Sequence, residues 1–173
     1  MTSQERPAGV HVVFHKLLRT PYDKNQRQQA ILAVLLYKRT QDAPIHPGHW
    51  ALFGGKVDQK DQDEKEALQR ELVDEHELIV NGLPEQEYKE LLAKAKHLTN
   101  VRVIREDEKR PLISYFEAPL NQDIASLRLG RNPKGCKVEG EGLGWFTEEE
   151  IHHLWMRPED RTALTRFFKL DVR

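Results

Sequence analysis

The sequence has little of three things that define whole classes of protein: cysteine, net charge and long apolar runs. Its one cysteine, Cys136, cannot form an internal disulfide or a cysteine-based zinc site alone. The 27 basic and 28 acidic residues leave a net charge of −1, so no overall charge attracts nucleic acid or an anionic membrane. No apolar run approaches the roughly 20 residues that span a bilayer, and the opening MTSQERPAG lacks the apolar stretch of a signal peptide. These absences predict a cytoplasmic protein that binds neither nucleic acid nor membrane.

What the chain does have is a pattern suited to one mixed α/β domain over residues 1–173. The length allows a core that folds without disulfides or a structural metal. Apolar and β-branched runs predict strands at 10–18, 30–37, 50–53, 101–105, 112–118 and 142–146, the third stopping at a diglycine. Helical spacing, prolines and a T-x-x-E capping box predict helices at 62–77, 84–97, 147–150 and 158–169, with an irregular loop at 121–137. Because strands and helices alternate irregularly, we expect a mixed sheet with helices packed against it.

The segment 54–78, GGKVDQKDQDEKEALQRELVDEHEL, is the part of the chain with the clearest chemical pattern. Glu71, Asp74 and Glu75 are spaced so that one helix face presents three carboxylates. Like charges at that spacing cost roughly 0.2–0.5 kcal/mol per pair, and Arg70 offsets only part of this. A hard divalent cation such as Mg²⁺ would make the arrangement favourable, because it prefers oxygen ligands and substrate phosphates.

The diglycine Gly54-Gly55 adds a second element to this pattern. Glycines let the backbone approach a ligand closely and adopt positive φ, and they leave a carbonyl free to coordinate metal. Taken singly, an acidic helix face is more often solvated surface, and a glycine pair is merely a turn. The joint order of strand, diglycine, acidic loop and acidic helix favours a metal and phosphate site.

This segment resembles the Nudix box, G-x5-E-x7-R-E-U-x-E-E-x-G-U, in which U is bulky and apolar. The matching residues are Gly55, Arg70, Glu71, Leu72, Asp74, Glu75 and Leu78, with Asp74 replacing the first glutamate of the pair. The later segment 145–151, WFTEEEI, also resembles one that is common near the end of Nudix domains.

The segment departs from the box in three ways. The stretch from Gly55 to Arg70 is one residue longer than the pattern. Gln62 stands where the first glutamate is expected, and either Asp61 or Asp63 could substitute for it. Glu77 replaces the late glycine.

The resemblance implies a Nudix-type α/β/α sandwich with a mixed sheet. It also implies Mg²⁺-dependent hydrolysis, with Mn²⁺ as an alternative metal, of a pyrophosphate bond in a nucleoside diphosphate linked to another moiety. Nucleoside triphosphates, nucleotide sugars and ADP-ribose are substrates of this type, and the box does not choose among them. Nudix enzymes are often homodimers, so a monomer and a homodimer are both compatible with the resemblance.

Matching positions assign roles to box residues. Glu71, Glu75 and Asp74 are expected to bind Mg²⁺, with the Gly54 carbonyl completing the site. Arg70 is expected to orient a glutamate by charge-assisted hydrogen bonding; a surface ion pair with Asp74 is its other interpretation.

The general base is a box glutamate or an acid of a later loop. Glu139 and Glu141 precede the predicted strand at 142–146 and are the loop candidates, although both could equally be ordinary loop acids. A base must lie within hydrogen-bond reach of the attacking water, which a sequence does not reveal.

Residues flanking the predicted cleft are candidates for substrate binding. They are Gly55, the basic residues Lys38, Arg39 and Lys56, and the aromatic residues Trp50, Phe53, Tyr115 and Trp145, of which we expect one at most to contact the ligand. Basic side chains are more commonly solvated, and aromatic residues on strands more commonly belong to the core. The histidine pairs at 46/49 and 152/153 lack a third ligand at suitable spacing, which argues against zinc.

Two other hypotheses remain open at this stage. The altered box is also compatible with a non-catalytic Nudix-like module that senses a nucleotide or binds a protein, although the retained Glu71 and Glu75 argue against it. An acidic helical interaction domain is the third interpretation, and it leaves the diglycine and the preceding strand unexplained.

Overall fold

The computed structural model describes residues 5–19, 29–75, 77–103, 111–130 and 140–171. The strands are β1 Gly9–Arg19, β2 Ala30–Arg39, β3 Trp50–Ala51, β4 Phe53–Lys56, β5 Leu78–Val80, β6 Lys96–Arg102, β7 Leu112–Pro119, β8 Leu127–Leu129 and β9 Gly140–Thr147. The helices are α1 Glu64–Gln69, the π-helical η1 Arg70–Asp74, α2 Glu85–Ala93, the 3₁₀ turn η2 Ile124–Ser126, α3 Glu148–Ile151 and α4 Pro158–Asp171. Within the described residues, no helix is both long and apolar enough to cross a membrane.

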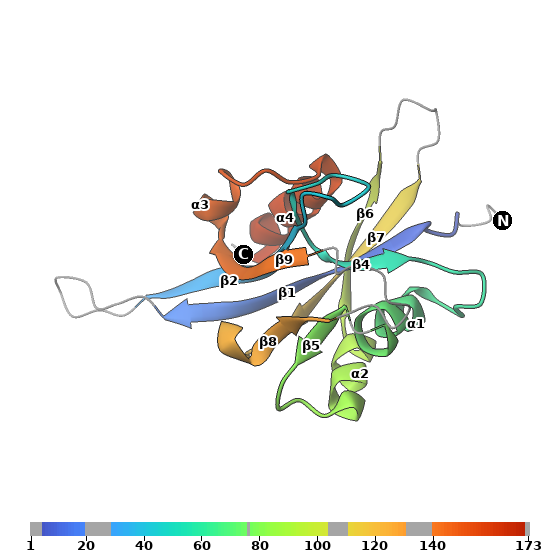
Figure 1. Cartoon of the computed structure of the whole chain (residues 1–173). Coiled ribbons are helices and arrows are strands. Elements are labelled where there is room, and N and C mark those ends of the chain that lie inside the picture. Colours follow the sequence, from blue (N-terminus) through green and yellow to red (C-terminus); the bar gives the residue numbers. More distant parts are fainter. Residues whose placement is uncertain (1–4, 20–28, 76, 104–110, 131–139, 172–173) are drawn as a thin grey trace.

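Strand β1 is the centre of the main sheet. It pairs antiparallel with β2 and β4 and parallel with β7, while β9 and β3 extend the sheet beyond β2 and β6 extends it beyond β7. Strands β5 and β8 form a separate two-stranded sheet. Figure 1 places α1 and α2 on one side of the main sheet and α3 and α4 on the other, which confirms the predicted sandwich around a mixed sheet.

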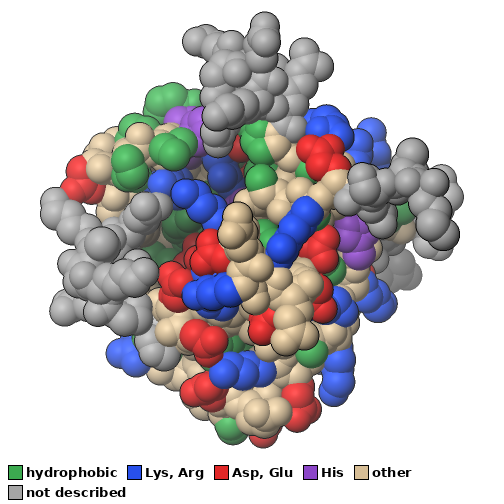
Figure 2. All heavy atoms as spheres, turned by 90° about the vertical axis from the view of Figure 1, so that its right-hand side faces the viewer, with side chains coloured by type: hydrophobic (Ala, Val, Ile, Leu, Met, Phe, Trp, Pro, Cys, Tyr) green, Lys and Arg blue, Asp and Glu red, His purple; other side chains and the backbone are tan. Residues whose placement is uncertain are grey.

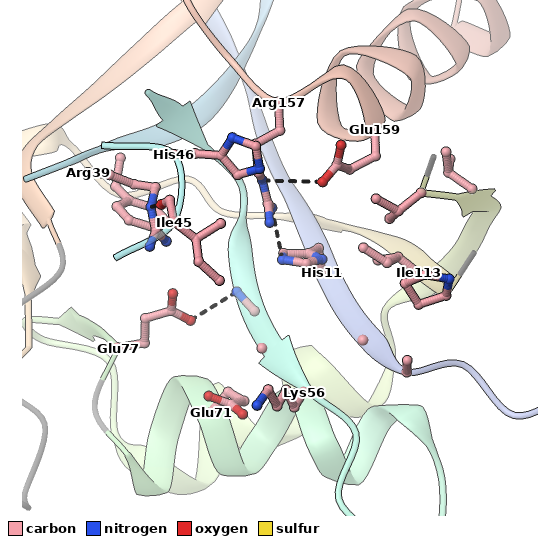
Figure 3. Close-up of a pocket in the computed structure, with 18 of the residues that line it drawn as sticks. His11, Arg39, Ile45, His46, Lys56, Glu71, Glu77, Ile113, Arg157 and Glu159 are labelled. Carbon is pink, nitrogen blue, oxygen red and sulfur yellow. Dashed lines mark hydrogen bonds and ion pairs between the residues drawn. The ribbon is translucent and has the colours of Figure 1, made fainter. Parts of the chain in front are cut away.

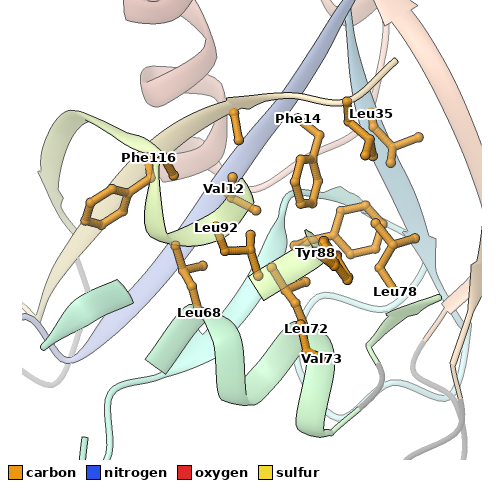
Figure 4. Close-up of a cluster of buried hydrophobic side chains, with 14 of the residues drawn as sticks. Val12, Phe14, Leu35, Leu68, Leu72, Val73, Leu78, Tyr88, Leu92 and Phe116 are labelled. Atoms are coloured by element: carbon orange, nitrogen blue, oxygen red, sulfur yellow. The ribbon is translucent and has the colours of Figure 1, made fainter. Parts of the chain in front are cut away.

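The alternation of side chains along β1 divides the core into two layers. Val12 and Phe14 face α1, η1 and α2, where they join a buried cluster with Leu72 and Tyr88 (Figure 4). Val13, between them in the chain, points to the opposite face and packs in the cluster that contains residues of α4. Because successive residues of a strand point to opposite faces, an almost continuous apolar sequence marks a strand covered on both sides.

The structure confirms five predicted strands in outline. The strand expected at 101–105 occupies Lys96–Arg102 instead, and residues 104 and 105 lie outside the described residues. Four other details are corrected. Strand β4 continues through Gly54-Gly55, because both glycines pair with β1. The helix expected at 62–77 is a short α-helix followed by a π-turn. The helix expected at 84–97 ends near residue 93, because the chain from residue 96 pairs with β7 as β6. The region 121–137, expected to be irregular, contains β8, which pairs with β5.

Candidate active site

The diglycine of β4 brings a strand and a helix into unusually close contact. Gly54 has a φ of +136°, and a Cβ on it would lie 2.0 Å from the Val10 carbonyl oxygen, so a side chain would break the pairing with β1. A Cβ on Gly55 would lie 2.2 Å from the carboxyl carbon of Glu71. The absence of a side chain at Gly55 therefore lets the Glu71 carboxylate lie directly against the backbone of β4.

Arg70 holds the acidic residues of this region together. Its Nε and Nη2 donate to the two carboxylate oxygens of Asp61 at 3.0 Å each, and Nη2 also donates to the Lys56 carbonyl at 2.7 Å. Its Nη1 donates to Oε1 of Glu71 and to Oε1 of Glu75, both at 2.9 Å. The guanidinium thus fixes both glutamates relative to the loop that follows β4.

Of the two acids named as substitutes for the missing box glutamate, Asp61 is the one that pairs with Arg70. Its side chain is 3% exposed, and the Arg70 guanidinium lowers its pKa. Asp63 has a different role, because it caps α1 by accepting the backbone N–H groups of Lys65 and Glu66. Burial raises the pKa of Glu71, against the opposing effect of Arg70.

The three carboxylates expected on one helix face do not stay together. The N–H of Glu75 donates to the Arg70 carbonyl at 2.7 Å, which is the wide i+5 turn of a π-helix. Glu71 and Glu75 both line the large cavity described below, whereas Asp74 does not. The Asp74 carboxylate lies 3.0 Å from Nζ of Lys89 on α2 and is about half exposed.

Glu77 is a site residue that the sequence reasoning did not select. Its Oε2 accepts the Gly54 N–H at 2.9 Å, and it lines the same cavity as Glu71 and Glu75. The available signal was its position: a carboxylate stands where the Nudix box has a glycine, two residues after Glu75.

A cavity of about 1120 Å³ lies above these acids. The carboxylates of Glu71 and Glu77 form one wall beside β4 (Figure 3). The opposite wall carries basic and imidazole groups together with one carboxylate, and its residues are His11, Arg39, His46, Arg157 and Glu159. On the face turned to the viewer in Figure 2, acidic and basic side chains alternate and do not separate into one large patch. The cavity can therefore hold a ligand that meets carboxylates at one end and cations at the other.

A buried network fixes Arg157 in the opposite wall. Its Nη2 lies 2.8 Å from Oδ2 of Asp160 and 3.1 Å from Nε2 of His11. Asp160 is fully buried and also accepts the Tyr115 hydroxyl at 2.9 Å. Burial and the neighbouring Arg157 lower the pKa of His11 to about 3, so its ring is neutral and its Nε2 can accept a hydrogen bond.

The structure brings some predicted substrate-binding residues to the cavity and leaves others in the core. Arg39, Gly55 and Lys56 line the cavity. Phe53 is fully buried against Tyr37 and belongs to the core.

Two further candidates also lie away from the cavity lining. Trp50 packs edge-on against Phe146 in the other core layer. Glu141, a candidate base, forms a 2.9 Å ion pair with Lys38. Glu139 and Cys136 lie outside the described residues.

The carboxylates present fit a divalent metal that takes few protein ligands. Oε2 of Glu71 and Oε2 of Glu75 receive no hydrogen bond from the described residues, since Arg70 contacts only the Oε1 atoms. Such hard oxygen donors suit Mg²⁺, which usually takes one or two carboxylates together with waters and substrate phosphates. In the described ranges, no group of three or more His, Cys, Asp or Glu side chains is close enough to hold a metal by itself.

Comparison with known proteins gives one family and a shared fold. The family model of the NUDIX domain matches residues 21–167. A MutT NUDIX hydrolase from Burkholderia pseudomallei is 23% identical, with a TM-score of 0.57, over 94% of this chain and 98% of that chain. The NUDIX domain of Shewanella oneidensis NrtR, solved with ADP ribose, is 14% identical, with a TM-score of 0.59, over 96% and 89%. A C. elegans Ap4A hydrolase is 19% identical, with a TM-score of 0.58, over 96% and 98%. No curated protein matches the chain.

Proposed function

The chain belongs to the Nudix family, and from this premise we propose that it hydrolyses a pyrophosphate bond in a nucleoside diphosphate linked to another moiety, with Mg²⁺ as cofactor and Mn²⁺ as an alternative. One observation carries the proposal: Glu71 and Glu75 share Arg70 beside the diglycine, inside a cavity of about 1120 Å³. This volume is slightly above the range of ordinary ligand pockets, roughly 300–1,000 Å³, and so admits a nucleotide.

The chain's own residues have distinct tasks in this reaction. The metal, when bound, would neutralise phosphate charge and help generate hydroxide from water. Glu71 and Glu75 would hold it through their Oε2 atoms, while Arg70 and Asp61 keep those glutamates in position. Because positioning errors near 1 Å can cost about a hundredfold in rate, the rigidity of this cluster matters for turnover.

The opposite wall supports the class of substrate. Arg39 and Arg157 line the far end of the cavity, where the charge of Arg157 is balanced by Asp160 and the N–H groups of both guanidiniums suit a phosphate oxygen or the carbonyl edge of a base. Two solved structures that share the fold are an ADP-ribose complex and an Ap4A hydrolase, which favours a nucleotide as the substrate here. For the general base, the ion pair of Glu141 with Lys38 favours a box glutamate over Glu141.

A substrate panel tests the proposal. Nucleoside triphosphates, nucleotide sugars, ADP-ribose and dinucleoside polyphosphates would be incubated with Mg²⁺ or Mn²⁺, and the products identified by mass. We expect Glu75→Gln to reduce turnover by orders of magnitude without unfolding the protein, because a neutral amide is a poor ligand for a hard cation. Glu87→Gln, on the exposed face of α2, is the matched control and should behave as the wild type. Binding of a nucleotide without any turnover, unchanged in Glu75→Gln, would instead support a sensing module.

A further inference from the structure

The position of Asp74 is the first of three observations that distinguish this site from the pattern of the box. Its carboxylate lies 3.0 Å from Nζ of Lys89, which also lies 2.9 Å from Glu85. Asp74 therefore belongs to an ion cluster between η1 and α2. It borders a small surface pocket together with Lys60 and Gln69, and it is not among the residues that line the large cavity.

The second observation is the shape of the turn that ends the box helix. The Arg70 carbonyl accepts the N–H of Glu75, and the Glu71 carbonyl accepts the N–H of Glu77 at 3.2 Å. Both spans are longer than the four residues of an α-helical bond. After this widened turn, Oε1 of Glu75 lies 2.9 Å from Nη1 of Arg70, and Oε2 of Glu77 lies 2.9 Å from the Gly54 N–H of β4. The carbonyl of Glu77 accepts the N–H of Gly130 at 3.2 Å. This hydrogen bond fixes the backbone of Glu77.

The third observation is the destination of the Glu77 side chain. Its carboxylate enters the large cavity and accepts the Gly54 N–H at 2.9 Å, on the same wall as Glu71 (Figure 3). The Nudix box has a glycine at this position, which has no side chain to offer. The carboxylate of Asp74 therefore lies outside the cavity, and that of Glu77, three residues later, lines it.

We propose that Glu77 replaces Asp74 as the third carboxylate beside the divalent metal that Glu71 and Glu75 bind. The inference rests on the proposed function, since it assumes that a metal binds at this wall. Glu77 contacts the metal through one carboxylate oxygen or through a metal-bound water. The same carboxylate also accepts the Gly54 N–H.

Direct metal binding tests this assignment without relying on activity. The free Mn²⁺ signal in electron paramagnetic resonance would be measured in titrations of the wild type, Glu77→Gln and Asp74→Asn, with no nucleotide present. Glutamine keeps an oxygen that can accept the Gly54 N–H, so the variant removes the charge but keeps the hydrogen bond. We expect Glu77→Gln to raise the Mn²⁺ dissociation constant about 10- to 100-fold, the range typical of groups that support a metal site. Asp74→Asn removes the same charge, and we expect a change of less than about twofold.

The outcomes separate this inference from the proposed function. If Asp74→Asn weakens Mn²⁺ binding and Glu77→Gln does not, Asp74 reaches the metal and the inference is wrong. If Glu75→Gln also has no effect, or the wild type binds no Mn²⁺, the proposed function itself fails. Thermal denaturation checks that each variant is folded. Should Glu77→Gln not fold, Glu77→Ala removes the carboxylate altogether, and unchanged Mn²⁺ affinity in that folded variant would also contradict the assignment.

Discussion

Substitution of Gly55 by alanine should lower catalytic activity strongly while lowering the stability of the folded protein only modestly. The new Cβ would lie 2.2 Å from the carboxyl carbon of Glu71 and 2.4 and 2.5 Å from its two oxygens. Ordinary contact begins near 3.4 Å, so the carboxyl group must retreat by about 1.2 Å. The colliding atoms end a flexible side chain, and the backbone of β4 therefore need not move.

The expected cost to folding is modest. Retreat of the carboxylate lengthens its 2.9 Å bond to Nη1 of Arg70, and a hydrogen bond to a charged group contributes about 1.5–3 kcal/mol. Alanine reduces the conformational entropy of the unfolded chain, and this effect stabilises the folded protein by about 0.4–1 kcal/mol. A net loss of about 1–2 kcal/mol would lower the melting temperature by about 2–8 °C for a chain of this size.

The expected cost to catalysis is larger. A displacement near 1 Å of a catalytic group lowers kcat/KM by about a hundredfold. The assay compares kcat/KM, Mn²⁺ affinity and melting temperature for the wild type and Gly55→Ala. Gly142→Ala on β9 is the matched control, because a Cβ there would meet nothing closer than 4.0 Å. Wild-type turnover and Mn²⁺ affinity in a folded Gly55→Ala protein would refute the role given to the Glu71 carboxylate.

Three further predictions concern the groups that hold the two walls in place. Asp61→Asn should destabilise the protein by about 1–3 kcal/mol in urea denaturation at pH 7. Since Arg70 lowers the pKa of Asp61, this difference should be present above the unfolded pKa near 3.9 and disappear as the pH falls through the folded pKa. Tyr115→Phe should cost about 1–2 kcal/mol, because it removes a buried hydrogen bond to Asp160; an unchanged urea midpoint would argue against that bond. The His11 ring should stay neutral in an NMR titration from pH 7 to pH 4, because its folded pKa is about 3. The unfolded chain binds the extra proton below its pKa of 6.5, so this residue lowers stability progressively from about pH 6.5 towards pH 3.

The sequence by itself determined the features that depend on local chemistry. The apolar run at 30–37 marked a strand because few other structures bury so continuous a sequence, and β2 occupies Ala30–Arg39. Thr147 and Glu150 form the predicted capping box, since both partners lie within one helical turn. The family followed from the spacing of Arg70, Glu71 and Glu75 after the diglycine, and the match over residues 21–167 confirms it.

Tertiary structure alone decided which side chains reach the cavity. Asp74 lies off the predicted face for two reasons: it pairs with Lys89 on another helix, and the turn is one residue wider than in an α-helix. Helical periodicity in the sequence predicts neither of these. Glu77 enters because Gly54, 23 positions earlier, offers it an N–H. Arg157 meets His11 across 146 positions of sequence, and only the folded sheet brings them together. Spacing in a sequence fixes neighbours within one element, whereas a site at the junction of several elements depends on contacts that exist only after they pack.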